Sequence, residues 1–461
     1  MKDLQNNHFT ESLNQQRRMA VLKLLWDHGR VYKSRLALAG IGVLGGAGAV
    51  LAFGWGVRAL VDQGFSNGHG AVLNQALLGL LTVIIVLAAA SYTRFYNVYW
   101  LAERMTADLR KKIFEKLLAQ NPAYFDEHKT GNEVARINAD TTVLHMAAAT
   151  NLPTAFRHLI TLCGGVIMLF WVSPSMTGLV LLVVPVVVGP IVFFGRRVRG
   201  KSRDTQARVG DVSAYSHEAL QSLQTIQSFG YEQHSLSHFA DICENVFTTA
   251  QGYIRIRSFL TAFVICVVFG AVGVVLLVGG HKVVAGMMTA GDLTAFVFYA
   301  IVVAGAVGSL SEAANAFHQA TGAADRILSL LNLPTASTAA SVQPLPVKGS
   351  LKFDHVSFSY PSRPDQPSLK DISFTVEAGT TVALLGPSGA GKTTVFQLLQ
   401  RFYEPASGII YIDQENLQAH APDVTRRAMA VVSQDPAIFS MSIADNICVG
   451  KPSATDRKSV V

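Results

Sequence analysis

Long apolar stretches without charge alternate with polar stretches over the first 331 residues. Five stretches contain no Asp, Glu, Lys or Arg, and residues 152–172 contain only Arg157, next to His158. A helix needs about 20 mostly apolar residues to cross a bilayer, and soluble helices carry a polar face at a spacing of 3.6 residues. Because these stretches lack such a face, the sequence predicts six transmembrane helices, at residues 36–57, 76–92, 152–172, 176–194, 259–280 and 293–310.

The connections between these stretches differ sharply in charge. Residues 62–74 and 173–175 contain no Lys or Arg, and Lys282 is the one exception on that side. Cytoplasmic loops are enriched in Lys and Arg, so both termini and the two long connectors are predicted to be cytoplasmic. The basic residues of the connectors are Arg104, Arg110, Lys111, Lys112, Lys116, Lys129, Arg136, Arg196, Arg197, Arg199, Lys201, Arg203, Arg208, Arg255 and Arg257.

Both long connectors have a helical pattern. In residues 104–119, Met105, Leu109, Ile113 and Leu117 form one apolar stripe, which is typical of a helix that continues beyond the membrane. Residues 130–133 read Thr-Gly-Asn-Glu, which fits a capping box, and predict the start of a short helix.

The composition agrees with a membrane protein. Of 461 residues, 50% are hydrophobic and only 15% are charged, with a mean hydropathy of +0.32, whereas soluble domains have about 25% charged residues. The net charge of +7 is explained by the cytoplasmic connectors, so a nucleic-acid partner is not expected. The four cysteines lack the spacing of a metal site. Residues 1–35 are polar and of mixed charge, so no cleavable signal sequence is expected there.

A soluble region is predicted after Leu331. Residues 332–349 are rich in Pro, Ser, Thr and Ala and are typical of a linker. Apolar residues at even spacing around 351–360 and 374–376 then predict strands, and residues 382–385, Val-Ala-Leu-Leu, predict a short buried strand.

A phosphate-binding motif directly follows this predicted strand. Residues 386–393 read Gly-Pro-Ser-Gly-Ala-Gly-Lys-Thr and match G-x-x-x-x-G-K-[ST], with a helical pattern after them. The glycines allow backbone N–H groups to turn toward phosphate oxygens, and the following helix adds its positive N-terminal end. Lys392 is expected to reach the β- and γ-phosphates, and the Thr393 hydroxyl to bind Mg²⁺.

Features on both sides of this motif resemble a known family. Ser359-Tyr360-Pro361 precedes the motif, and Gln434 follows it within Val-Ser-Gln-Asp-Pro. Phe125-Asp126 with Thr130-Gly131, Arg136 and Asp140, and later residues 218–232, are similar to the two connectors of exporter-type ABC half-transporters. The resemblance runs from about residue 31 to residue 452.

The resemblance implies roles for particular residues. Tyr360 would stack on adenine, and Gln434 would contact Mg²⁺ together with Thr393. Short helices at 130–135 and 220–228 would dock on the nucleotide-binding domain, and two half-transporters would pair as a homodimer or heterodimer. The residues implied to bind ATP are Tyr360, Gly386, Pro387, Ser388, Gly389, Ala390, Gly391, Lys392, Thr393, Thr394 and Gln434.

The sequence also departs from the family pattern. The 461 residues contain no LSGGQ-type signature, no second acidic strand to provide the Walker B aspartate and the catalytic glutamate, and no switch histidine. We therefore expect a nucleotide-binding domain truncated within its sequence, and we expect that this chain by itself hydrolyses no ATP and drives no transport.

The expected architecture is an α-helical membrane domain of six transmembrane helices followed by a partial α/β P-loop domain. Its parts are a cytoplasmic segment at 1–30, a transmembrane domain at 31–331, a linker at 332–349 and the partial nucleotide-binding domain at 350–461. The expected location is the plasma or inner membrane.

Two functions remain open at this point. The chain is either the ATP-binding subunit of an exporter for hydrophobic or amphipathic substrates, lipid or drug-like, or a non-catalytic ATP-binding membrane protein or inert remnant. Arg157 and His158 either meet an anionic substrate or extend to the lipid headgroups.

Overall fold

The computed structural model describes residues 19, 23, 26, 27, 29–65, 70–128, 130–333 and 348–451. The chain divides into two compact units, one of residues 1–108 and 141–325, the other of residues 109–140 and 326–461. Most of the predicted N-terminal segment 1–30 and of the predicted linker 332–349 lies outside the described residues.

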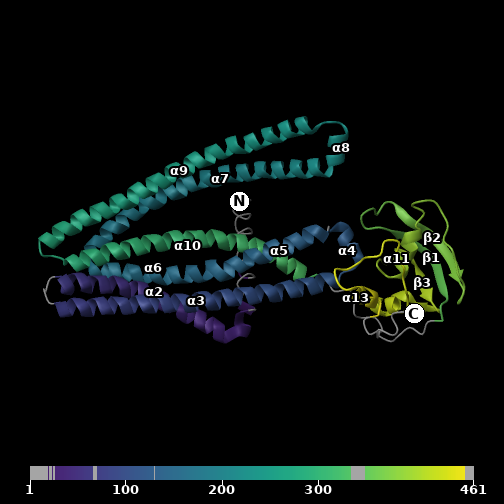
Figure 1. Ribbon diagram of the computed structural model, residues 1–461, viewed down its shortest axis with the longest axis horizontal. Helices are drawn as coiled ribbons and strands as arrows, with labels where there is room; N and C mark the ends of the chain where they lie inside the picture. The colour runs from purple at the N-terminus through teal and green to yellow at the C-terminus, as the bar shows by residue number, and fades with distance from the viewer. Residues whose placement is uncertain are drawn as a thin grey trace, which may run out of the picture. The chain divides into compact units, whose positions relative to one another are not determined.

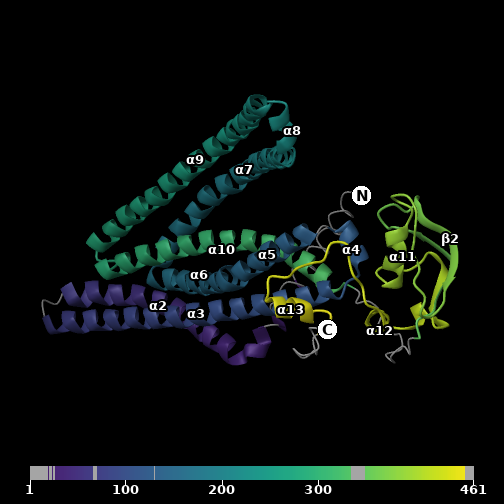
Figure 2. The ribbon, with the colours of Figure 1, turned by 45° about the vertical axis from the view of Figure 1, so that its right-hand side comes forward.

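Long helices make up the first unit (Figure 1). The helices α7 and α9 lie side by side in Figure 1 and in Figure 2. Pro174 begins α7 directly after Ser173, whose backbone is extended, and thereby separates α7 from α6. The elements are η1 (Arg30–Tyr32), α2 (Lys33–Ala59), the π-helix η2 (Leu60–Phe65), α3 (Gly70–Leu118), the π-helix η3 (Ala147–Asn151), α6 (Leu152–Val172), α7 (Pro174–Gln221), α8 (Leu223–Ser228), α9 (Glu232–Val284) and α10 (Ala290–Leu331).

Five helical stretches of the described residues are long and apolar enough to cross a membrane, and they contain five of the six predicted spans. Large apolar side chains on these helices and on α7 face outward, including Leu182 (71% exposed), Phe269 (71%) and Ile167 (68%). Such surfaces are rare on soluble monomers and are typical of interaction with a membrane. The remaining predicted span, 176–194, is helical as part of α7, and its crossing of the membrane stays a prediction.

Small residues let α2, α6 and α10 approach closely. A Cβ on Gly54 of α2 would lie 2.6 Å from the Tyr299 ring of α10, and one on Gly165 of α6 would lie 2.7 Å from Val303. The Tyr299 hydroxyl donates a 2.7 Å hydrogen bond to the carbonyl oxygen of Leu51. Glycine at these contacts permits the close backbone packing by which membrane helices associate.

The first connector confirms one prediction and corrects another. The stripe Met105, Leu109, Ile113 and Leu117 is buried along α3, as predicted. The short helix is α4 (Pro122–Glu127), whereas Thr130 begins the 17-residue α5 (Thr130–Met146), so the prediction of a short helix at 130–135 was wrong. A helix-start signal fixes where a helix begins, but its length depends on later residues, and none breaks α5. In the second connector, α8 falls within the predicted 220–228.

A four-stranded antiparallel sheet in the order β2-β1-β3-β4 forms the core of the second unit. Leu351 of β1 lies opposite both Val376 of β2 and Ile412 of β3. The apolar face buries Phe353 and Ile410 against Leu398 of α11, which confirms the strands predicted from even spacing. The elements are β1 (Leu351–Ser359), β2 (Pro367–Val376), α11 (Lys392–Leu399), β3 (Ser407–Ile412), β4 (Glu415–Asn416), η4 (Leu417–Ala419), α12 (Pro422–Arg427) and α13 (Ile443–Cys448).

The buried strand predicted at residues 382–385 is not observed. This segment has no strand assignment, and its residues Val382 and Leu385 are 54% and 90% exposed. A strand is stabilised by hydrogen-bonded neighbours, and among the described residues β1 to β4 pair only with one another. An apolar pattern alone therefore did not determine a strand here.

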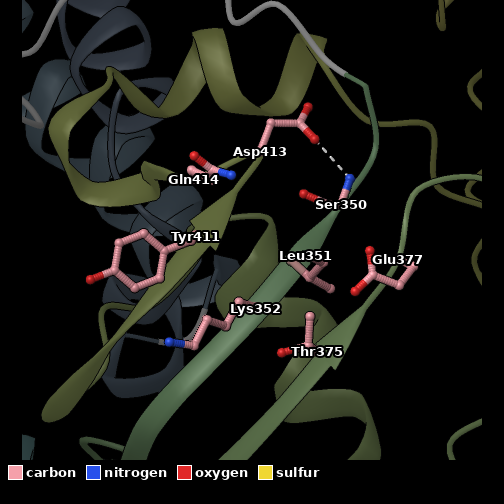
Figure 3. A pocket seen from close by; sticks show the side chains of 8 residues that line it. All are labelled: Ser350, Leu351, Lys352, Thr375, Glu377, Tyr411, Asp413 and Gln414. Atoms are coloured by element: carbon pink, nitrogen blue, oxygen red, sulfur yellow. Dashed lines mark hydrogen bonds between the residues drawn. The ribbon is translucent and has the colours of Figure 1, made fainter.

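Asp413, just after β3, forms hydrogen bonds with the backbone just before β1. Asp413 and Gln414 have φ angles of 49° and 73° and form the two-residue turn between β3 and β4. The Asp413 carboxylate accepts hydrogen bonds from the backbone N–H groups of Gly349 and Ser350, at 3.0 and 2.8 Å, and from that of Lys348. Figure 3 shows the Ser350 bond beside a cavity of about 360 Å³. These donors, Ser350 foremost, hold the pKa of Asp413 below its ordinary value.

Candidate functional site

The glycine-rich loop before α11 adopts a backbone that only glycine tolerates well. Gly389 and Gly391 have φ angles of +85° and +84°. A Cβ on Gly391 would lie 2.7 Å from the carbonyl oxygen of Ser368 and 2.6 Å from a methyl carbon of Leu369. The loop therefore packs directly on the backbone of β2, and Gly391 allows this close approach.

Lys392 closes the loop on itself. Its ammonium group donates hydrogen bonds to the carbonyl oxygens of Gly386 (2.8 Å) and Pro387 (2.7 Å). The backbone N–H of Ala390 donates to the same Pro387 oxygen at 3.2 Å. The Lys392 cation thus lies within the loop, at the N-terminus of α11. Helix N-termini favour anions, so the cation and the helix end together suit a phosphate group.

A cavity of about 550 Å³ lies between this loop and the connection from β1 to β2. Eight of the eleven predicted ATP-binding residues line it, and Gly386 and Pro387 contribute through their bonds to Lys392. Four further lining residues were missed, and their only sequence signal is their place right after Tyr360. The lining consists of Tyr360, Arg363, Gln366, Pro367, Ser368, Ser388, Gly389, Ala390, Gly391, Lys392, Thr393 and Thr394.

Tyr360 is held at one wall of this cavity. Its hydroxyl hydrogen-bonds with Thr394 Oγ1 at 3.0 Å and donates to Gln397 Oε1 at 2.5 Å, both on α11. Its ring meets the Phe358 ring edge-on, with centroids 5.0 Å apart. An aromatic ring next to a phosphate-type loop can stack on a nucleobase.

The two predicted magnesium ligands lie in different surroundings. Thr393 lines the cavity, whereas Gln434 is exposed in the segment between α12 and α13 and does not line it. No cluster of His, Cys, Asp or Glu in the described residues suits a metal ion by itself. A Mg²⁺ held by a hydroxyl and by nucleotide phosphates fits these surroundings, because Mg²⁺ is usually bound with few protein ligands.

Helix α4 docks on the sheet domain within the second unit. Ala123 packs against the apolar core that contains Phe353 and Leu398, and the Tyr403 hydroxyl donates a hydrogen bond to the Asp126 carboxylate. The docking that the resemblance implied for residues 130–135 is therefore made by α4.

Comparison with known proteins gives matches over most of the chain. The family model described as "ABC transporter transmembrane region" matches residues 36–307, and the model described as "ABC transporter" matches residues 369–460. The chain is 29% identical to an export ATP-binding/permease protein of Rickettsia bellii, over 93% of this chain and 74% of that protein. It is 30% identical to the mitochondrial ATP-dependent permease MDL1 of Schizosaccharomyces pombe, over 91% of this chain and 59% of that protein. It is also 29% identical to the ABC multidrug transporter mdr2 of Aspergillus fumigatus, and there it spans about half of the relative's length, 54%.

Proposed function

Because the chain belongs to the ABC transporter family, we propose that it is the ATP-binding subunit of an exporter. The proposed substrate is hydrophobic or amphipathic, either a lipid or a drug-like molecule. The observation that carries this proposal is the combination, in one polypeptide, of apolar membrane helices and a cavity lined by a glycine-rich, lysine-containing loop.

In the proposed complex, ATP occupies the cavity of the second unit. Residues 386–394 hold the phosphates, Tyr360 stacks on the adenine, and Mg²⁺ binds the phosphates and the Thr393 hydroxyl. Gln434 joins the Mg²⁺ only if the segment between α12 and α13 moves toward the cavity. Bound Mg²⁺ would neutralise phosphate charge, and Lys392 would transfer its hydrogen bonds from the loop carbonyls to phosphate oxygens.

A second cavity, in the first unit, supports the substrate class. It has a volume of about 670 Å³ and lies between α2, α3 and α6. Its lining side chains are apolar and include Trp26, Leu44, Met105 and Phe156. Small-molecule sites are mostly apolar concavities of several hundred Å³, so this cavity suits the apolar part of a lipid or drug.

The proposed assembly is a homodimer or a heterodimer of half-transporters in a plasma or inner membrane. The Lys and Arg residues of both long connectors support a cytoplasmic location for these connectors and for both termini. ATP would then bind on the cytoplasmic side.

One observation favours a second candidate function, ATP binding without hydrolysis. None of the described residues that line the nucleotide cavity is Asp or Glu. Phosphoryl transfer to water usually needs a group that orients the attacking water. The cavity as described can bind and neutralise phosphates but does not itself supply that group.

Reconstituted vesicles separate these candidates. The purified chain is placed in liposomes, and ATP binding, phosphate release and movement of a fluorescent amphipathic dye are measured for the wild type and Lys392→Ala. Dye movement that requires ATP and Lys392 supports the exporter. ATP binding without phosphate release or dye movement supports the second candidate, and absence of ATP binding contradicts both.

A further inference from the structure

We propose that Tyr403, anchored by Asp126 of α4, positions the Tyr360 ring for recognition of the nucleotide base. The inference rests on the proposed ATP site and adds a residue that touches neither the phosphates nor the base. It also makes base recognition depend on whether α4 is docked.

Tyr403 is buried, and its hydroxyl group has a hydrogen-bond acceptor. Tyr403 lies just after α11, is 7% exposed, and donates its hydroxyl hydrogen bond to the Asp126 carboxylate. A buried hydroxyl without a partner is costly, and a carboxylate is a strong acceptor. Burial first, and then the bond to Asp126, raise the pKa of Tyr403, so the hydroxyl remains a donor across the physiological pH range.

The ring of Tyr403 supports Tyr360 from one side. The two rings meet edge-on at 84°, with centroids 5.2 Å apart. The Phe358 ring contacts both tyrosines, with its centroid 5.4 Å from that of Tyr403 and 5.0 Å from that of Tyr360. Edge-to-face contacts at these distances are favourable and directional, so a displaced Tyr403 ring would leave the Tyr360 ring free to tilt.

The opposite end of Tyr360 is fixed on α11. Its hydroxyl contacts Thr394 and Gln397, and Thr394 is adjacent to Thr393 and 4% exposed. A continuous series of contacts thus leads from Asp126 through Tyr403 and Tyr360 to the start of α11.

The phosphate half of the site meets this series at Thr394 but is held in place by separate contacts. Lys392 closes its loop through Gly386 and Pro387, and Gly391 packs on the backbone of β2. Loss of the Tyr403 support should therefore weaken binding of the base and leave binding of the phosphates nearly unchanged. By thermodynamic linkage, base binding would in turn favour the docked α4.

The test compares two ligands, Mg-ATP and Mg-tripolyphosphate, which lacks the base and the sugar. Their affinities are measured by calorimetry on the full chain in lipid nanodiscs, for the wild type, Tyr403→Phe, Asp126→Asn, Tyr403→Leu and the double variant Asp126→Asn/Tyr403→Phe. The matched control is Tyr411→Phe, a tyrosine of β3 outside the nucleotide cavity.

We expect Tyr403→Leu to weaken ATP binding by roughly three- to tenfold, the range of one aromatic contact, with tripolyphosphate binding unchanged. Tyr403→Phe and Asp126→Asn should show smaller losses that do not add in the double variant, because both act on the same hydrogen bond. Tyr403→Phe removes its donor, and Asp126→Asn replaces its charged acceptor with a neutral one. Tyr411→Phe should bind both ligands like the wild type.

The variant Tyr360→Ala separates this inference from the proposed function. If Tyr360→Ala binds ATP like the wild type, the adenine assignment itself fails. If Tyr360→Ala loses ATP affinity but every Tyr403 and Asp126 variant keeps it, the positioning role is wrong. Equal loss of both ligands in the Tyr403 variants would show a general structural role and would also overturn the inference.

Discussion

The guanidinium of Arg326 donates two hydrogen bonds to the carboxylate of Asp140, at 2.9 and 2.5 Å, across 186 residues of sequence. The Asp140 side chain is 5% exposed, and Arg136 contributes a weaker contact at 4.0 Å. The pair joins α5 to the last part of α10, the helix that leads into the sheet domain. It therefore holds the first connector and the end of the last membrane helix together.

We predict that Arg326→Gln destabilises the second unit by about 1–3 kcal/mol, because it leaves a buried carboxylate with a distant partner. The half-exposed position of Arg326 keeps the loss at the lower end of values for buried pairs. Thermal unfolding in detergent measures the effect. Arg208→Gln is the matched control, since its pair with Asp211 is exposed on both sides. An equal melting temperature for Arg326→Gln and the wild type would contradict the prediction.

A second prediction concerns two glycines of the phosphate loop with the same backbone conformation. Alanine at Gly389 or Gly391 incurs the cost of a left-handed residue, roughly 1 kcal/mol. Only at Gly391 would the added carbon also clash with the Ser368 carbonyl. Gly391→Ala should therefore lose ATP affinity by roughly tenfold or more relative to Gly389→Ala, a further 1.4 kcal/mol. Similar affinities for the two variants would show that the close packing is unimportant.

The pH dependence of stability should report Asp413. Its pKa is lowered in the folded chain, so its stabilising effect is fully present above the unfolded value of about 3.9. The effect is lost as the pH falls through the lowered folded value. The melting temperature of the wild type should exceed that of Asp413→Asn by a constant amount above about pH 5. This difference should shrink below pH 4, and a difference independent of pH would contradict the assignment.

Membrane topology can be tested with single cysteines in a background that lacks Cys163, Cys243, Cys266 and Cys448. Ser228→Cys in α8 should react with a membrane-impermeant maleimide only after the cells are opened, because α8 belongs to a basic connector. Met287→Cys, in the turn before α10 and 71% exposed, should react in intact cells. The reverse result at either position would rule out cytoplasmic termini.

The sequence was sufficient for features that depend on local pattern. The apolar stretches predicted the membrane helices because lipid requires a continuous apolar surface. The glycine and lysine spacing of 386–393 predicted the loop because φ angles above zero and a close approach to β2 leave few alternatives. The apolar stripe that includes Met105 and Leu109 likewise followed from helical periodicity alone.

Features that depend on residues far apart in the chain could not be predicted from local sequence patterns. The strand predicted at 382–385 does not form because no described strand pairs with it. The bond between Tyr403 and Asp126 joins residues 277 positions apart. The family resemblance included Asp126, but no local pattern in the sequence links it to Tyr403. The capping signal at residues 130–133 predicts a helix start but not a helix length, and the short helix of this connector begins instead at Pro122, a residue type favoured at helix starts.

ATP binding by the full chain in nanodiscs tests the central claim most directly. Titration with a fluorescent ATP analogue is predicted to show saturable binding that depends on Mg²⁺. Lys392→Ala removes the cation of the loop and should weaken binding by roughly tenfold or more, as expected for loss of a charge-assisted contact. Tyr360→Ala should weaken it by a smaller factor, that of one aromatic contact. Unchanged affinity in both variants would contradict the assignment of this cavity as the ATP site.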